Sequence, residues 1–240
     1  MPGRTKTRLV PPLTAAEAAH FNTAFLKDVS VNLLTASRDA HVHGYMAYGP
    51  PGSQQFFIDT LPPGIGLIES WYPNFGDCLF NAIDALLEAG HEAAVVLNSD
   101  SPTLPTSLLI ETAEMLARPG DRAVLGPSTD GGYYLLGLKQ AHRRLFDDID
   151  WSTERVARQT LERAHEIGLP VHVLPAWYDV DDADALRQLH SELFEGRSLK
   201  GGLVPFRARH TTVLMGDLLV EAQLGTRLSL AHDAFEQIAS

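Results

Sequence analysis

Short apolar runs alternate with longer segments whose apolar residues recur at helical spacing along most of the chain. The runs at 93–97, 122–125, 133–138 and 171–174 are continuous, which is typical of strands covered on both faces of a sheet. Helical segments with Pro, Gly or Asp at their ends lie between them. This alternation predicts an α/β fold with a mostly parallel central sheet.

Most of the expected helices begin and end at recognisable signals. Thr14 and Glu17 have the spacing of a capping box and predict a helix to about Val29. Asp77 is the expected N-cap of a helix that stops at Gly90. Further helices are predicted over 105–117, 151–168 and 182–193.

The remaining segments have weaker patterns. Residues 41–49 predict a strand, and residues 54–70 an irregular strand-and-loop region. Composition shifts near residue 195, where a glycine-rich loop begins. We therefore expect a domain over residues 1–195 and a C-terminal extension over 196–240 packing on it, with a strand at Thr211–Met215.

Composition and charge narrow the class of partner. The net charge of -11 disfavours nucleic acid. Cys78 is the single cysteine, so no disulfide can form within the chain and a reducing compartment is expected. The first ten residues lack the apolar core of a signal peptide, and no apolar run approaches the roughly 20 residues of a membrane span. A cytoplasmic protein without a membrane span is the expectation.

Carboxylates follow two of the expected strands. Asp100 lies three residues beyond the 93–97 run, on a loop bounded by prolines, and Asp179 and Asp181 follow the 171–174 run. Ligands of open parallel sheets bind beyond the carboxyl ends of the strands. Two carboxylates meeting there need a proton or a cation between them, and Mg²⁺ or Mn²⁺ with substrate phosphates is a usual solution. The alternative is that the second cluster only caps the following helix.

Two other stretches are ambiguous when read alone. Asp130, Gly131 and Gly132 permit positive φ and close approach to a ligand, but Asp-Gly also marks a tight turn between strands. Lys6 and Arg8, in a basic alternation with the residue at position 4, form either a phosphate-binding loop or a solvated terminus.

The motifs together resemble a known family. In order they are PGRTKTRL (2–9), NSDSPTLP (98–105), GPSTDGGYYLLGL (126–138), IDWSTERV (149–156) and YDVDDADAL (178–186). This set resembles the bacterial DUF2064-type glycosyltransferases, described as radical-SAM-associated or arsenosugar-biosynthesis enzymes, of the nucleotide-diphospho-sugar transferase superfamily. The resemblance covers roughly residues 2–190 and implies the GT-A fold, a Rossmann-like sandwich.

The resemblance also implies roles for individual residues. Asp100 stands at the superfamily's metal-binding aspartate, and Asp181 at the second metal-side aspartate, with Asp179 beside it. Lys6 and Arg8 match the basic loop near the phosphates of the nucleotide.

The same resemblance assigns a second group of residues to the sugar or acceptor pocket. Asp130, Gly131 and Gly132 match the segment that lines it, and Asp130 is the candidate catalytic residue, acting as a base. Trp151 and Ser152 are expected to line the same pocket.

The chain departs from the family pattern in three places. The family has a strand before its PGxxKTRL loop, whereas here Met1 directly precedes Pro2; this N-terminal strand is apparently missing, and Thr211–Met215 is a candidate to fill its position. Asn81 stands where Gly-Asp-Leu-Gly-x-Arg has its arginine, and Ala185 replaces an acidic residue.

The expected function is a metal-dependent glycosyltransferase that moves a sugar from a nucleotide-diphospho-sugar to a small-molecule acceptor, with Mg²⁺ or Mn²⁺ as cofactor. One alternative keeps the fold but joins an NTP to a phosphorylated small molecule, as a nucleotidylyltransferase. Another is a catalytically weak nucleotide-binding protein. The three differ in product: a nucleoside diphosphate, pyrophosphate, or none.

Overall fold

The computed structural model describes residues 3, 5–196 and 202–229; position 4 and the end of the extension lie outside them. None of the helices in this described part combines the length and apolar character needed to cross a bilayer. The chain divides into two compact units, and each is described by itself. The first comprises Met1–Val31, Ser99–Pro105 and Asp179–Ser240, and the second Asn32–Asn98 and Thr106–Tyr178.

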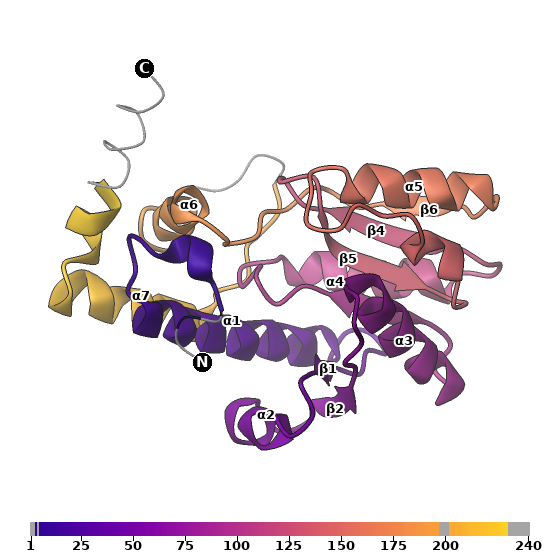
Figure 1. Ribbon diagram of the computed structural model, residues 1–240, viewed down its shortest axis with the longest axis horizontal. Helices are drawn as coiled ribbons and strands as arrows, with labels where there is room; N and C mark the ends of the chain where they lie inside the picture. Colours follow the sequence, from indigo (N-terminus) through magenta and orange to yellow (C-terminus); the bar gives the residue numbers. More distant parts are fainter. Residues whose placement is uncertain (1–2, 4, 197–201, 230–240) are drawn as a thin grey trace. The chain divides into compact units, whose positions relative to one another are not determined.

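A four-stranded sheet forms the centre of the second unit (Figure 1). Its order is β3-β5-β4-β6; β4 pairs with β6 in parallel, and β5 runs antiparallel to both β3 and β4. Three of its strands therefore share one direction, as the sequence predicted. The strands are β3 (Ala94–Leu97), β4 (Ala123–Pro127), β5 (Tyr133–Leu138) and β6 (Val171–Val173), and a separate parallel pair consists of β1 (Tyr45–Tyr48) and β2 (Gly66–Glu69).

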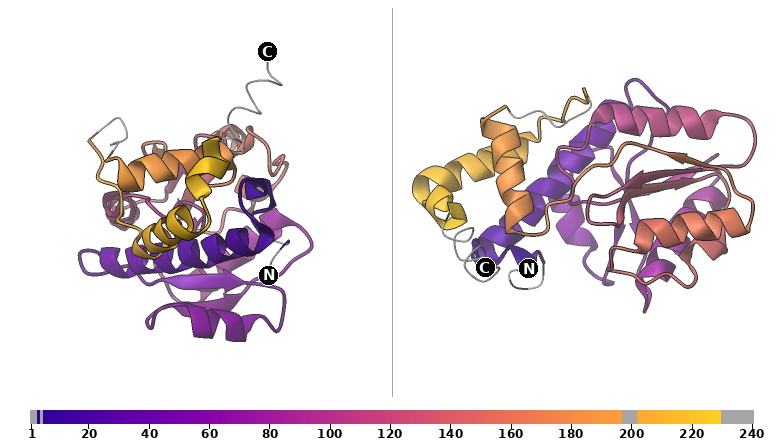
Figure 2. Two further views of the ribbon diagram at one scale, coloured as in Figure 1. Left: turned by 90° about the vertical axis from the view of Figure 1, so that its left-hand side faces the viewer. Right: turned by 90° about the horizontal axis from the view of Figure 1, so that it is seen from above.

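Helices cover both faces of this sheet (Figure 2). Leu136 and Leu138 of β5 belong to a buried cluster that includes side chains of two helices and the short helix η2. Gly137, between them, has no side chain. A Cβ at this position would lie on the other face of the sheet, 2.9 Å from Leu116 of a third helix. Successive residues of β5 thus face opposite sides of the sheet, and each side is covered by an apolar layer of helices. The first face carries α3 (Phe75–Glu88), η2 (Arg143–Phe146) and α5 (Val156–Glu166), and the second α4 (Thr106–Ala117).

The first unit is helical. It contains η1 (Thr7–Leu9), most of α1 (Ala15–Ala36), α6 (Ala183–Phe194) and α7 (Arg209–Glu221). The predicted capping box is confirmed: the Thr14 N–H donates to Glu17 Oε2 at 2.7 Å, and the Glu17 N–H donates to Thr14 Oγ1 at 3.2 Å.

Several predicted boundaries were wrong. Helix α1 continues past Val29 to Ala36, and the region predicted as irregular holds α2 (Gln54–Thr60) and β2. The N-cap of α3 is Asn74, whose side chain accepts from the Asp77 N–H at 2.8 Å, so Asp77 lies in the first turn. Helix α5 begins at Val156, after a turn over 151–155.

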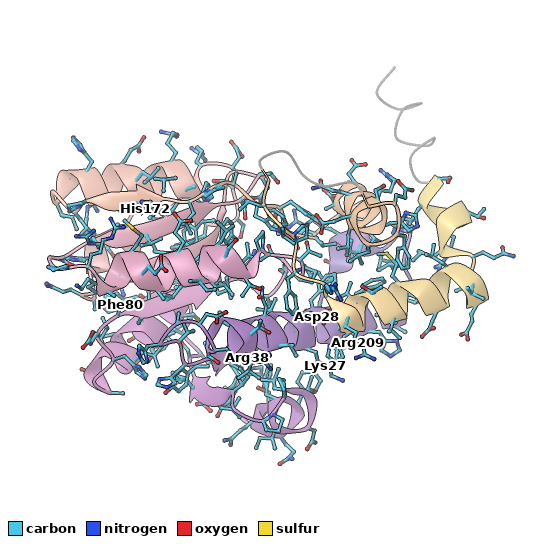
Figure 3. The ribbon with its side chains drawn as sticks, turned by 180° about the vertical axis from the view of Figure 1, so that it is seen from behind. Lys27, Asp28, Arg38, Phe80, His172 and Arg209 are labelled. Carbon is cyan, nitrogen blue, oxygen red and sulfur yellow. The ribbon has the colours of Figure 1, made fainter. Side chains whose placement is uncertain are left out.

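The predicted strand at Thr211–Met215 was also wrong, because these residues lie in α7. The cause is Asp28 of α1, which is 1% exposed (Figure 3). Its carboxylate accepts from the backbone N–H of His210 at 2.9 Å and of Thr211 at 2.7 Å. A carboxylate bound to the first N–H groups stabilises a helix start and outweighs the strand preference of β-branched residues. Thr211–Met215 therefore does not stand in for a sheet strand.

The extension also bonds to other segments of its unit. Phe206 N–H donates to the Thr103 carbonyl at 3.0 Å, on the loop that carries Asp100. Arg227 binds both carboxylate oxygens of Glu17 at 2.9 Å. These bonds connect the extension to α1 and to the Asp100 loop. The division into a domain 1–195 and an extension 196–240 packing on it stays a prediction.

The Glu17–Arg227 pair gives a pH-dependent prediction. Hydrogen bonding to Arg227 lowers the pKa of Glu17 below 4.5, so its contribution is present above pH 4.5 and is lost as the pH falls through the lowered pKa. We expect Arg227→Met to lower the free energy of unfolding by about 1–2 kcal/mol at pH 7. Denaturant titrations from pH 7 to pH 3 should show this difference shrinking below pH 4.5.

Arg158→Met is the matched control, because Arg158 pairs with Glu162 on the surface of α5 and is 62% exposed. Such exposed pairs contribute little. A cost for Arg227→Met that stays constant down to pH 3 would contradict the role given to Glu17.

Candidate functional site: an ammonium between two aspartates

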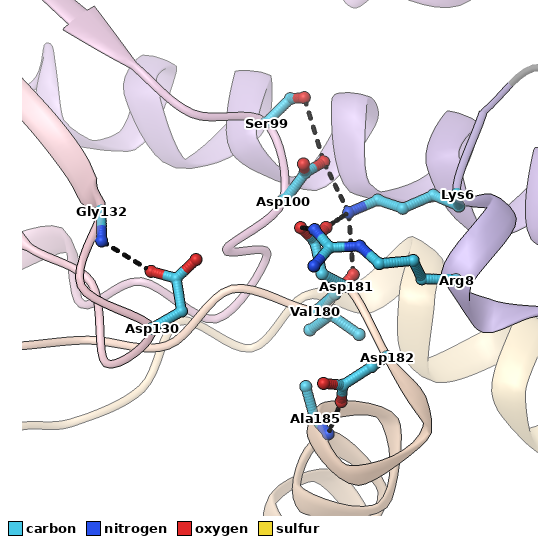
Figure 4. A network of polar contacts seen from close by, with 10 residues as sticks. All are labelled: Lys6, Arg8, Ser99, Asp100, Asp130, Gly132, Val180, Asp181, Asp182 and Ala185. Carbon is cyan, nitrogen blue, oxygen red and sulfur yellow. Dashed lines mark hydrogen bonds and ion pairs between the residues drawn. The ribbon is translucent and has the colours of Figure 1, made fainter. Parts of the chain in front are cut away.

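The ammonium of Lys6 lies between two aspartates that are distant in sequence (Figure 4). Lys6 Nζ is 2.9 Å from Asp100 Oδ1 and 2.6 Å from Asp181 Oδ1, and it donates to the Val180 carbonyl at 2.7 Å. The three N–H groups of the ammonium thus face two hydrogen-bond acceptors, Asp181 Oδ1 and the Val180 carbonyl, and one ion-pair partner, Asp100. The convergence of Asp100 and Asp181, which the sequence suggested, therefore occurs around a cation of the chain itself.

Local backbone geometry directs Lys6 inward. Lys6 is the residue before η1 and has φ 53° and ψ 41°, in the left-handed region. For a residue with a side chain this conformation costs about 1–2 kcal/mol. The Lys6 side chain is 5% exposed and also lies over the ring of Phe25, 5.5 Å from its centroid. The ion pairs and this ring contact offset the strain.

The two aspartate loops are held to each other by the main chain as well. Val180 N–H donates to the Asp100 carbonyl at 2.8 Å, and the Ser99 hydroxyl donates to Asp100 Oδ1 at 3.2 Å. Residues 101–105, which include the two prolines, are all buried. A buried, proline-containing loop with these bonds keeps the Asp100 carboxylate in place.

The charges of the cluster balance. Arg8, which is 70% exposed, forms an ion pair with Asp181, so two carboxylates face two cations. The Asp100 and Asp181 side chains retain 30% and 26% exposure, which leaves them accessible from solvent. The cluster is therefore neutral without any further ion.

The donor set fits a divalent cation only in part. Asp100 Oδ1 and Asp181 Oδ1 both reach one point, the Lys6 nitrogen, so the two carboxylates can share a cation. The described residues contain no group of three or more His, Cys, Asp and Glu side chains placed for a metal, and the half-buried Asp179 completes no such group. Mg²⁺ is commonly held by one or two carboxylates plus substrate phosphates. A divalent ion held here would need phosphate oxygens to complete its coordination, and Asp179 as a ligand stays a prediction.

Neighbouring acidic residues have structural roles. Asp182 caps α6 by accepting from the Ala185 N–H at 2.9 Å, and Asp184 pairs with Arg187 one turn later. The helix-capping alternative is therefore right for Asp182, while Asp181, one residue before it, binds Lys6 and Arg8.

Asp130, Gly131 and Gly132 form a turn in the second unit. Asp130 is exposed, and its Oδ1 accepts from the Gly132 N–H at 2.9 Å. Gly131 has φ +93°, and an added Cβ would lie 2.2 Å from the Glu154 carbonyl oxygen. The tight-turn reading is confirmed, because the segment joins β4 and β5 and its glycine lies close to Glu154 of the same unit. Close approach to a ligand stays a prediction.

Trp151 and Ser152 lie just before α5 in the second unit. The Trp151 ring contacts Phe75 and Tyr133 edge-on, with centroids 5.3 and 6.4 Å apart, and packs against the buried cluster under the sheet. Burial raises the pKa of the Tyr133 phenol, which stays neutral. Ser152 is exposed with φ 64°. Trp151 thus has a packing role, and a pocket role for either residue stays a prediction.

A basic residue, Arg143, lies beside the segment in which Asn81 stands in place of the family's arginine. Asp77 pairs with Arg143 of η2 at 2.5 Å, and the Arg143 guanidinium lies 5.0 Å from the centroid of the Phe80 ring. Asn81 instead donates from its side chain to the Asp77 carbonyl at 2.8 Å. Asp77 therefore has a basic partner from another segment of the chain, while Asn81 bonds within its own helix.

Sequence reasoning missed three contributors to the cluster around Lys6. The Val180 carbonyl carries no sequence signal, because any residue offers one. The Phe25 ring has the sequence signal of any apolar residue on a helix face, which does not indicate a contact with Lys6. Ser99 adjoins Asp100 in the NSDSPTLP motif and was the one contributor that the motif itself contained.

Comparison with solved structures places this fold in a class. One match, with a TM-score of 0.79 and 24% identity, is the crystal structure of a Desulfovibrio desulfuricans G20 protein. That protein is described as a candidate nucleotide-diphospho-sugar transferase. The match covers 95% of this chain and 93% of that one. CMP:2-keto-3-deoxy-manno-octonic acid synthetase in complex with CTP matches with a TM-score of 0.48 and 12% identity, over 72% of this chain and 88% of that one. The first match confirms the expected fold, and the second adds nothing to it.

The family follows from the sequence match. Residues 32–153, just over half of the chain, match the model of the family described as "Uncharacterized protein conserved in bacteria (DUF2064)". The chain belongs to this family, as its motifs suggested. No curated protein matches the sequence.

The Gly131 turn gives a stability prediction with a matched control. We expect Gly131→Ala to destabilise by both backbone strain and overlap with Glu154, and Gly90→Ala, at φ +95° with nothing within 4 Å, by strain alone. Strain costs about 1–2 kcal/mol, and overlap adds about 1–3 kcal/mol. Denaturant unfolding of both variants measures the difference, and equal losses would contradict the tight contact at Gly131.

Proposed function

We propose that this protein is a glycosyltransferase that uses a nucleotide-diphospho-sugar donor and a small-molecule acceptor. One observation carries the proposal: Lys6 and Arg8 meet Asp100 and Asp181 in one cluster, at the loop that follows β3. Two cations and two carboxylates are suited to a diphosphate, since the cations bind its oxygens and the carboxylates bind a bridging ion.

The cluster matches the needs of the leaving group. As the glycosidic bond breaks, negative charge grows on the departing nucleoside diphosphate. Lys6 and Arg8 are placed to bind that charge, and their contacts strengthen as it grows, which favours the transition state over the ground state. A divalent cation held by Asp100 and Asp181 would supply further charge neutralisation on the same oxygens.

For the residues of the second unit, a role toward the sugar or the acceptor is proposed from the family resemblance and from their own local geometry alone. We assign Asp130 as the base that removes the proton of the acceptor, because its carboxylate is exposed and oriented by the Gly132 N–H. Gly131 and Gly132 would line the donor sugar with main-chain groups. Ser152, exposed at a positive φ before α5, would offer its hydroxyl, with Trp151 beneath it as support.

The reaction is tested by product analysis. Purified protein is incubated with a panel of nucleotide sugars or NTPs, Mn²⁺ or Mg²⁺, and candidate acceptors. Release of a nucleoside diphosphate from a sugar donor supports the proposal. Release of pyrophosphate from an NTP would instead identify a nucleotidylyltransferase, whose leaving group suits the same cluster. Nucleotide binding without turnover would identify a nucleotide-binding protein.

A binding experiment tests Asp100 directly. The unfolding temperature of the unaltered protein should rise when a suitable nucleotide sugar binds, and it should rise further when Mn²⁺ is added. A ligand present at a hundred times its Kd raises the free energy of unfolding by about 2.7 kcal/mol. We expect Asp100→Asn to lose the Mn²⁺-dependent part of this shift. Asp217→Asn, at an exposed position on α7 in the same unit, is the control and should retain it. An unchanged Mn²⁺ response in Asp100→Asn removes Asp100 from the site.

A further inference from the structure

The Lys6 ammonium occupies the position that a divalent ion would need. It binds Asp100 Oδ1 and Asp181 Oδ1, which are the oxygens that would hold the ion, and its third N–H is used by the Val180 carbonyl. With a side chain that is 5% exposed, it is shielded from competing water. An ammonium and a divalent ion within about 4 Å repel strongly, so the two occupy these oxygens alternately.

We propose that Lys6 is an internal cation that keeps the Asp100–Asp181 pair closed to divalent ions until a diphosphate ligand binds. The diphosphate then draws the ammonium onto its own oxygens, and the two carboxylates pass to the incoming ion. This inference rests on the proposed function, because it names the order in which that site is filled. Its consequence is that metal and diphosphate enter together and neither binds tightly alone.

Charge accounting supports this order. The empty cluster is neutral, so a divalent ion entering alone leaves two positive charges in excess and deprives Lys6 of its carboxylate partners. A diphosphate entering alone meets Asp100 and Asp181, which repel it. When both enter, the two carboxylates face the divalent ion, and the cationic side chains face the diphosphate.

Arg8 and the backbone of Lys6 favour the exchange. Arg8 binds the same aspartate but is 70% exposed, so it can contact an arriving phosphate before the buried ammonium moves. Lys6 has a left-handed backbone, which its side-chain contacts help to stabilise. Relaxation of this backbone on release of the two carboxylates would offset part of the cost of that release.

The first test measures Mn²⁺ binding without nucleotide, by the loss of the free-ion signal in electron paramagnetic resonance. We expect Lys6→Met to bind Mn²⁺ at least about tenfold more tightly than the unaltered protein, a difference of about 1.4 kcal/mol. The double variant Lys6→Met with Asp100→Asn should lose that gain. Lys27→Met is the control for net charge, because it removes one positive charge away from the cluster, on α1. This variant should bind Mn²⁺ as the unaltered protein does. Equal or weaker binding by folded Lys6→Met overturns the proposal.

The second test uses the unaltered protein and so does not depend on the folding of a variant. Equilibrium dialysis measures retained Mn²⁺ with and without pyrophosphate, and retained pyrophosphate with and without Mn²⁺. Because coupling between two ligands is reciprocal, each should tighten the other by the same factor, at least about tenfold. Tight Mn²⁺ binding without pyrophosphate overturns the proposal. So does absence of Mn²⁺ binding with it, which would make Lys6 a permanent substitute for the metal.

The two proposals fail in different ways. If no sugar donor releases a nucleoside diphosphate but Mn²⁺ and pyrophosphate bind cooperatively, the proposed reaction is wrong and the lysine exchange stands. If donors turn over but Mn²⁺ binds independently of pyrophosphate and Lys6→Met gains nothing, the exchange is wrong and the reaction stands.

Discussion

One ammonium group joins three segments that lie far apart in the sequence. Lys6 comes from the start of the chain, Asp100 from the loop after β3, and Asp181 from the segment before α6. A shielded ion pair stabilises only when its geometry satisfies every donor, because desolvation of the charges is expensive. Here the third N–H finds the Val180 carbonyl, and that residue also bonds the Asp100 loop through its own N–H. The arrangement of the first unit around its candidate site depends on this group.

An arrangement fixed before a ligand arrives is what electrostatic catalysis requires. Dipoles and charges that are already oriented do not have to reorganise as charge develops. The Asp100 loop satisfies this condition through buried prolines and main-chain bonds, and Phe206 of the extension adds another bond to the same loop. In the proposed exchange, the groups that change partners are the long cationic side chains of Lys6 and Arg8.

Much of the fold follows from local pattern. The continuous apolar runs gave four strands of the sheet, and the Thr14–Glu17 spacing gave the start of α1, because both signals act within a few residues. The predicted strand at Thr211–Met215 failed because its helical state is decided by Asp28, which lies far away in sequence. The N-cap of α3 was misplaced by three residues because Asn74 and Asp77 are both good capping residues.

The sequence predicted some residues of the candidate site from local pattern, and others only through the family resemblance. The place of Asp100 follows from the end of a strand and a proline-bounded loop. That Lys6 and Arg8 belong near it came from family resemblance, since composition alone allowed a solvated terminus. That the lysine takes the place expected for a metal could not be predicted, because it depends on side-chain reach and on the left-handed backbone at one residue.

The attachment of the C-terminal helix has a consequence for the evolution of the chain. In the part of the chain that the structure describes, the side chain of Asp28 on α1 bonds to His210 and Thr211 of the extension, and Glu17 adds Arg227 of the extension to the bonds of its own helix cap. In a relative without the extension, a carboxylate at position 28 would lose the helix end it neutralises, and an apolar residue would serve that surface better. The acidic residues at positions 17 and 28 and the segment that supplies their partners should therefore change together among relatives.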